Sequence, residues 1–153
     1  MAMQRITDEL LIPIPLDEAW DFFTNPRNLA KLTPKEMNFR HVFEPDAERV
    51  YKGMYLVYKV SPIGGIPLTW VTEITEVLPK KRFVDDQING PFAKWHHIHE
   101  FEDRGDQTLI RDILYYEMPL GFLGSMAHWL FAKKQVAQIF SFRKERMEEL
   151  FGK

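Results

Sequence analysis

The sequence lacks several features that would assign it to a common functional class. The chain of 153 residues contains no cysteine, which excludes disulfides and thiolate metal sites. Its 20 basic and 22 acidic side chains give a net charge of -2, whereas a nucleic-acid-binding domain needs a strongly basic face. The longest mostly apolar stretch, Met118 to Ala132, is shorter than a membrane span and contains His128.

The length and the first residues set the expected organisation. A chain of this size fits one domain and can bury a core without covalent crosslinks, so we expect a single domain over residues 1–153. Residues 1–9 contain no apolar core of a signal sequence, and the expected location is therefore cytoplasmic. Aromatic residues make up 14% of the chain, which predicts an interior lined with rings.

The order of expected elements begins with one strand and two short helices. Gln4–Ile12 mixes apolar and polar residues as a strand does, and the prolines that follow it cannot donate to a β-ladder. Leu16–Phe23 and Pro26–Leu32 are expected helices, the second capped by Asn25. Alternating patterns and turn residues then predict the strands Asn38–Phe43, Met54–Ser61, Leu68–Leu78, Arg82–Ile88, Pro91–Phe101 and Thr108–Met118.

The last part of the chain predicts one long helix. Ser125 to Phe151 contains no glycine or proline, and apolar residues recur there at spacings of three and four. A helix of this length spans about 40 Å, enough to cross a sheet. The short links between strands favour antiparallel pairing. We therefore predict an α+β fold, in which a curved antiparallel sheet of about seven strands wraps on the C-terminal helix and leaves a cavity between them.

The most informative stretch is Pro91–Phe101, because three of the five histidines lie within four of its residues. In a strand, alternate side chains point to opposite faces. One face then carries Trp95, His97, His99 and Phe101, while His96 faces the other way with Ile98 and Glu100. A face that mixes large aromatic rings with imidazoles predicts the wall of a pocket.

The neighbouring strands add polar groups to the same face. In Thr108–Met118, Arg111 and Glu117 indicate which face meets water, so Asp112 and Tyr116 are predicted to point inward. In Arg82–Ile88 the pattern does not choose between a face with Phe83, Asp85 and Gln87 and the opposite face. Buried polar groups of this kind need partners among themselves, in water or in a ligand.

These residues and their order resemble the START-like, or SRPBCC, superfamily with its helix-grip fold, which includes steroid and lipid transfer domains, the birch pollen allergen, polyketide cyclases and coenzyme Q-binding proteins. The resemblance covers nearly the whole chain and is closest to a polyketide cyclase/dehydrase-like ligand-binding subgroup, some of whose members are fused to epimerase-like domains. It implies a hydrophobic cavity between sheet and long helix, but no particular ligand. The segments that carry it are Pro15-Leu-Asp-Glu-Ala-Trp-Asp-Phe-Phe, Asn25-Pro-Arg-Asn-Leu, Phe83-Val-Asp-Asp-Gln, Gly90-Pro-Phe, His97-Ile-His-Glu-Phe and Tyr116-Glu-Met-Pro-Leu-Gly.

Binding or transport of a small hydrophobic or amphipathic molecule is the first functional hypothesis. Aromatic and methionine side chains supply apolar walls that adapt to an irregular ligand. This interpretation involves no cofactor, no metal, no nucleic acid and no stable membrane insertion. The residues expected to contact the ligand are Tyr58, Trp70, Phe83, Asp85, Gln87, Trp95, His97, His99, Phe101, Asp112, Tyr116, Met118, Met126 and Trp129.

Enzymatic action is the alternative, with His97, His99 and Asp112 as candidate catalytic residues. Histidine titrates near neutral pH, and an aspartate partner can orient it for the acid–base chemistry of a cyclase, dehydratase or hydrolase. The same three residues can also ligate iron, zinc or nickel, since a His-x-His pair on one strand face points both rings the same way. A third hypothesis is an accessory interaction module for an epimerase-like partner.

Two features of the last third of the chain remain open. Pro119–Trp129, which contains Gly121 and Gly124, is either a mobile gate or an ordinary loop and helix start. The basic residues of the long helix alternate with glutamates, so we expect a solvated face there and not a membrane-binding patch. These basic residues are Lys133, Lys134, Arg143, Lys144 and Arg146.

Overall fold

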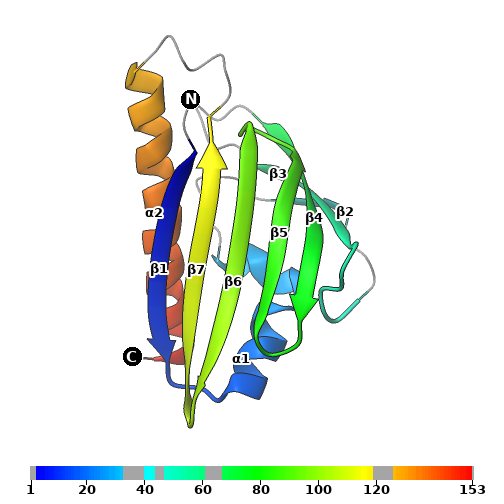
Figure 1. The fold of residues 1–153 in the computed structure, drawn as a ribbon, viewed down its shortest axis with the longest axis vertical. Coiled ribbons are helices and arrows are strands. Elements are labelled where there is room, and N and C mark those ends of the chain that lie inside the picture. The colour runs from blue at the N-terminus through cyan, green and yellow to red at the C-terminus, as the bar shows by residue number, and fades with distance from the viewer. Residues whose placement is uncertain (1–2, 33–39, 44–46, 61–66, 119–125, 153) are drawn as a thin grey trace.

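The computed structural model describes residues 3–32, 40–43, 47–60, 67–118 and 126–152. Within these ranges, seven strands form one antiparallel sheet with the order β1-β7-β6-β5-β4-β3-β2, so the first strand pairs with the last (Figure 1). This confirms the predicted fold class and the count of seven strands. The strands are β1 (Gln4–Ile12), β2 (Arg40–Phe43), β3 (Tyr55–Val60), β4 (Leu68–Leu78), β5 (Arg82–Asn89), β6 (Lys94–Arg104) and β7 (Gln107–Glu117).

The strand that carries the histidines begins later than the sequence suggests. β6 starts at Lys94, and residues 91–93, which were predicted to be the first residues of the strand, form a bend. Pro91 has no N–H to donate, which disfavours ladder pairing at this point. The bend is closed by Gln87, whose side-chain amide both donates to the carbonyl of Phe92 (2.6 Å) and accepts from its N–H (3.2 Å).

Two short helices follow β1, as the sequence predicts. α1 (Leu16–Phe23) starts after Pro15, and the hydroxyl of the buried Thr24 donates to the carbonyl of Trp20 at its end (2.6 Å). The next helix, η1 (Pro26–Leu32), has 3-10 geometry, and the side chain of Asn25 caps it by accepting from the N–H of Arg27 (3.0 Å). α1 therefore presents Trp20 to the sheet, where it meets Phe101 edge-on at 5.1 Å.

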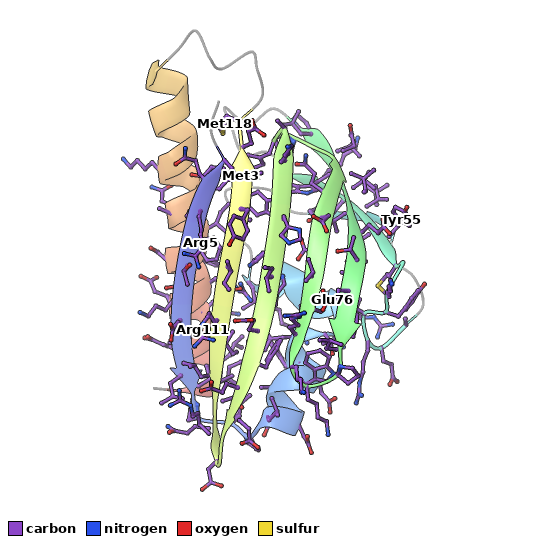
Figure 2. The ribbon with its side chains drawn as sticks, viewed as in Figure 1. Met3, Arg5, Tyr55, Glu76, Arg111 and Met118 are labelled. Atoms are coloured by element: carbon purple, nitrogen blue, oxygen red, sulfur yellow. The ribbon has the colours of Figure 1, made fainter. Side chains whose placement is uncertain are left out.

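The long helix α2 (Met126–Phe151) covers the same face of the sheet as α1 and η1. It runs beside β1 and β7 behind the sheet in Figure 1, and it packs against β1 and η1. The opposite face of the sheet carries charged side chains together with some exposed apolar ones: Figure 2 shows Arg5, Glu76 and Arg111 there as well as Tyr55. Arg111 pairs there with Glu9 (3.4 Å) and Glu100 (3.3 Å), which confirms that its face of β7 points away from the core.

Candidate functional site

A cavity of about 160 Å³ lies between the sheet, η1 and α2. Its walls are mostly apolar, because every second residue of β3 and β4 points inward. Polar groups enter it mainly from β5, β6 and α2. The residues that line it are Phe23, Asn25, Pro26, Asn28, Leu32, Val50, Leu56, Tyr58, Val60, Trp70, Thr72, Ile74, Phe83, Asp85, Trp95, His97, His99, Ile139, Phe140 and Arg143.

Aromatic rings form one wall of the cavity. Trp70 stacks on Tyr58 (ring centroids 5.9 Å apart) and meets Trp95 edge-on at 4.9 Å. Tyr58 faces Trp70 across the β3–β4 pair, and the third ring comes from β6. Aromatic contacts with these geometries are favourable and hold the side chains in defined positions. The apolar wall is thus held in place by contacts among its own rings.

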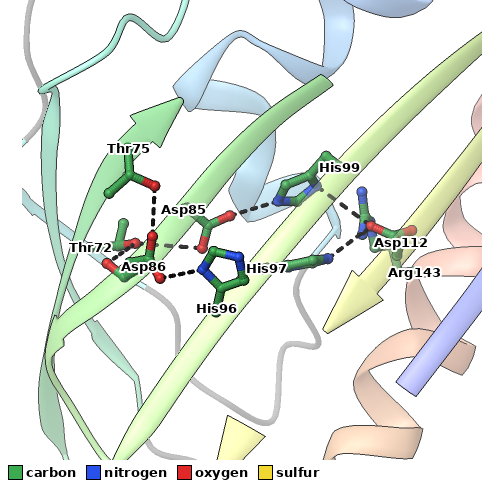
Figure 3. A network of polar contacts seen from close by, with 9 residues as sticks. All are labelled: Thr72, Thr75, Asp85, Asp86, His96, His97, His99, Asp112 and Arg143. Atoms are coloured by element: carbon green, nitrogen blue, oxygen red, sulfur yellow. Dashed lines mark hydrogen bonds and ion pairs between the residues drawn. The ribbon is translucent and has the colours of Figure 1, made fainter. Parts of the chain in front are cut away.

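Five ionisable side chains, Asp85, His97, His99, Asp112 and Arg143, form what we call the buried polar cluster. The strand register creates most of it, because Asp85 lies opposite His97 in the β5–β6 pair and His99 lies opposite Asp112 in the β6–β7 pair. α2 supplies Arg143. Figure 3 shows His97 and His99 between Asp85 on one side and Asp112 with Arg143 on the other, whereas His96 points to the other face of the sheet and contacts Asp86.

Hydrogen bonds link the cluster through its two carboxylates. Asp112 accepts from Arg143 (2.5 Å), and its Oδ1 lies 2.9 Å from Nε2 of His97. Asp85 Oδ2 lies 2.6 Å from Nε2 of His99. The rings of Phe83, His99 and His97 stack in that order, with centroid separations of 4.2 and 3.8 Å. Both imidazoles are therefore fixed in position by packing as well as by a carboxylate partner.

Burial controls the charge of the cluster. Desolvation, with a further contribution from nearby His97, lowers the pKa of His99 to about 4, despite the hydrogen bond to Asp85. Burial alone would raise the pKa of Asp112, but the charge of Arg143 and the hydrogen bond to His97 hold it well below its ordinary value. Burial alone would also raise the pKa of Asp85, but the hydrogen bond from His99 and the charges of the histidines and Arg143 together lower it. At neutral pH two carboxylates thus face one guanidinium and a neutral His99.

Two buried side-chain nitrogens among the described residues have no hydrogen-bond partner, Nε1 of Trp70 and Nδ1 of His99. Both residues line the cavity. When Nε2 of a neutral His99 carries the proton and donates it to Asp85, its Nδ1 presents a lone pair towards Oδ1 of Asp112, 3.5 Å away. An unpaired buried polar atom costs about 1–3 kcal/mol, so the arrangement is incomplete without a further group.

The comparison with protein families decides the family. A family described as polyketide cyclase / dehydrase and lipid transport matches residues 12–141. The chain belongs to this family. Its fold is START-like, and the family supports a ligand-binding or cyclase-type function. No curated protein matches the sequence.

Solved structures with the same fold include a START superfamily protein and an aromatase/cyclase. A START superfamily protein from Mycobacterium smegmatis is 15% identical with a TM-score of 0.69, covering 95% of this chain and 98% of that one. The Zhui aromatase/cyclase from Streptomyces sp. R1128 is 12% identical with a TM-score of 0.71, covering 95% and 92%. At these identities the likeness shows the fold alone.

A third structure is longer than this chain. The nucleoside-diphosphate sugar epimerase from Corynebacterium glutamicum is 23% identical with a TM-score of 0.65, and the match covers 94% of this chain but only 28% of that one. The chain thus spans about a quarter of that relative's length. None of the helices in the described ranges of this family member is long and apolar enough to cross a membrane.

Half of the residues predicted to contact a ligand line the cavity of this polyketide cyclase/dehydrase family member. These are Tyr58, Trp70, Phe83, Asp85, Trp95, His97 and His99. The register also decides the face of β5 that the sequence left open: Phe83 and Asp85 point inward, and Gln87 closes the bend before β6. The side chains of Met126 and Trp129 lie outside the described part. Of the segment Pro119–Trp129, left open as a gate or an ordinary loop and helix start, residues 119–125 also lie outside it, and the rest begins α2.

The remaining predicted residues point inward but do not line the cavity. Asp112 lies behind His97 with 3% of its surface exposed, and Tyr116 is 1% exposed against Phe92 and Trp95. Phe101 is covered by Trp20, and Met118 is buried in the core. The inward orientation predicted for Asp112 and Tyr116 is confirmed, because Arg111 and Glu117 marked the opposite face correctly.

The prediction of a solvated basic face on α2 is wrong for Arg143. Its side chain is 9% exposed and bonded to Asp112, because Arg143 lies on the same helix face as Phe140 and Met147, three residues before it and four after it. That spacing was the signal that could have identified it. Lys144, next along the chain, is exposed, as predicted. Sequence reasoning also missed the wall residues from η1 and its flank, such as Asn25, Asn28 and Leu32.

Proposed function

We propose that this chain, as a single ligand-binding domain, binds a small amphipathic molecule in the cavity. The observation that carries the proposal is an apolar cavity with a pre-formed, buried polar cluster at one side. Ligand sites in proteins are typically apolar pockets with a few fixed polar groups that orient the ligand. The apolar part of the molecule would lie against Trp70 and Tyr58, and its polar group would face His99 and Arg143.

A pocket-filling variant tests this proposal. Ile139 of α2 lines the cavity, so Ile139→Trp should fill part of the 160 Å³ and exclude the ligand. Ala137→Trp places the same ring on the exposed side of the helix and serves as the control. Molecules that co-purify with each protein are extracted and identified by mass spectrometry, and titration with anilinonaphthalene sulfonate provides a second readout. If both variants retained the co-purified molecule equally, the ligand would bind outside this cavity.

A cyclase or dehydratase activity at the same site is the second candidate. It is favoured by the hydrogen-bonded chain Arg143–Asp112–His97, in which the carboxylate orients an imidazole that reaches the cavity. In this scheme His97 and His99 would transfer protons, and Asp112 would orient His97. In an assay with a β-keto chain that cyclises with loss of water, His97→Gln should abolish turnover and retain substrate binding. Unchanged turnover in His97→Gln and His99→Gln would exclude this role.

An accessory role beside an epimerase-like protein is the remaining hypothesis. It is supported by the Corynebacterium glutamicum structure, in which a region like this chain forms part of a longer epimerase. Affinity purification from the native source, followed by identification of stoichiometric partners, tests it.

A further inference from the structure

We propose that Asp85, His97 and His99 form a site for a divalent transition-metal ion at the polar side of the cavity. One potential ligand atom from each residue lies within 4.8 Å of those of the other two. All three residues line the cavity, so an ion held there would keep a coordination position open towards a ligand.

The arrangement behind the two histidines is the one that metal-binding histidines require. A metal-ligating imidazole usually donates its second ring N–H to a carboxylate, which fixes the ring and the tautomer. Asp112 lies behind both rings: its Oδ1 is 2.9 Å from Nε2 of His97 and 3.5 Å from Nδ1 of His99. Arg143 in turn holds Asp112. The ion would therefore bind Nδ1 of His97 and Nε2 of His99.

Metal binding would also complete the hydrogen bonding of the cluster. With Nε2 of His99 bound to the ion, the ring proton moves to Nδ1, which is the nitrogen that now has no partner and faces Asp112. Asp85 would exchange its hydrogen bond with His99 for a metal bond. Two ligands of a tetrahedral ion at about 2.0 Å are roughly 3.3 Å apart, so the present 2.6 Å contact must lengthen by well under 1 Å.

The charge of the cluster also favours a cation. Two ionised carboxylates face one guanidinium, and a divalent ion offsets the excess negative charge with one positive charge to spare. That surplus suits an anionic or easily deprotonated oxygen of the ligand. Two nitrogens and one carboxylate oxygen fit zinc, iron(II), cobalt or nickel better than calcium or magnesium.

Metal titration of protein purified without a histidine tag and treated with a chelator tests the site. Isothermal titration calorimetry with Zn²⁺ and Co²⁺ should show one site per chain. Asp85→Asn, His97→Gln and His99→Gln should each remove it, and Asp112→Asn should weaken it about 10- to 100-fold. His96→Gln is the matched control, because His96 is on the same strand and bonded to a carboxylate but on the outer face. It should bind the ion as the wild type does.

A second measurement does not depend on how the variants fold. In NMR spectra of the imidazole nitrogens of labelled wild-type protein, Zn²⁺ should shift the ring signals of His97 and His99 and leave those of His96 unchanged. The melting temperature should rise with metal concentration, since the ion binds the folded chain. No stoichiometric binding, or binding lost equally in His96→Gln, would overturn the proposal. These readouts use the metal alone, so they can fail while ligand binding in the cavity holds, and the reverse.

Discussion

Replacing Arg143 by methionine should destabilise the protein strongly, because it removes the cation that compensates a buried carboxylate. Asp112 is 3% exposed and Arg143 is 9% exposed, so water can replace little of the lost interaction. At an effective dielectric constant of about 20, a pair of unit charges about 4 Å apart gains roughly 4 kcal/mol. Loss of one partner of a buried pair typically costs about 3–5 kcal/mol. We expect a loss of that size in the free energy of unfolding at pH 7.

Urea unfolding followed by tryptophan fluorescence measures the effect. Lys144→Met changes the neighbouring exposed residue of α2 and should alter the free energy of unfolding by no more than about 0.5 kcal/mol. The double variant Arg143→Met with Asp112→Leu removes both charges and should be more stable than Arg143→Met alone, because no buried charge is left uncompensated. It should not reach the wild type, since Nε2 of His97 loses Asp112 as its acceptor. A cost for Arg143→Met no greater than that for Lys144→Met would refute the reasoning.

The dependence of stability on pH in the acid range provides a further check on the pair of Arg143 and Asp112. The pKa of Asp112 is lowered in the folded chain, so its contribution to stability is complete above its ordinary pKa of 3.8 and is lost as pH falls below that value. Arg143→Met removes the main group that lowers this pKa. The deficit of Arg143→Met relative to the wild type should therefore shrink as the pH falls towards the range where Asp112 takes up a proton in the variant.

Three further measurements test other parts of the structure. In metal-free protein, the unfolded chain binds a proton at His99 more readily than the folded chain between about pH 6.5 and 4. The free energy of unfolding of the wild type should therefore fall by about 3 kcal/mol more than that of His99→Leu over this window. Parallel curves of stability against pH would contradict the lowered pKa of His99. Trp20→Ala should lower the free energy of unfolding in urea by about 3–5 kcal/mol, because the ring is 4% exposed and packs against Phe83 and Phe101. A loss as small as that caused by Leu78→Ala, at an exposed position, would show that neighbouring side chains fill the space left by the ring. His96→Ala should change stability by no more than about 1 kcal/mol, since its ion pair with Asp86 is half-exposed.

The sequence was sufficient to predict the inward faces of β6 and β7. In β7, Arg111 and Glu117 marked the outer face, and in β6 the alternation of aromatic rings and imidazoles marked the inner one. The period of two thus placed His97, His99 and Asp112 together without any knowledge of the register. In β5 the same rule failed, because both faces mix apolar residues with an aspartate. Only the pairing of Asp85 with His97 and of Phe83 with His99 decides which face of β5 points inward.

Contacts between elements far apart in the chain were not predictable from local patterns. Arg143 lies among charged residues of a helix, where arginine is ordinarily exposed. Its burial depends on where α2 crosses the sheet, which brings it to Asp112, 31 residues earlier in the chain. For the same reason, Phe101 and His99 share a strand face but meet different environments: α1 covers the first with Trp20, and the cavity begins beside the second.

The buried polar cluster is difficult to explain by stability alone. A buried ion pair is often no more stabilising than apolar residues of the same volume, and each buried charge must be fully paired to avoid a cost. Here Nδ1 of His99 remains unpaired, although one leucine in its place would remove the problem. The surrounding apolar core, which includes Leu114 and Phe140, shows that apolar side chains can be packed in this part of the interior. A cluster that is costly to bury, lies beside a cavity and lacks one partner is best accounted for by a group that binds there, which is the physical basis for both the ligand and the metal proposals.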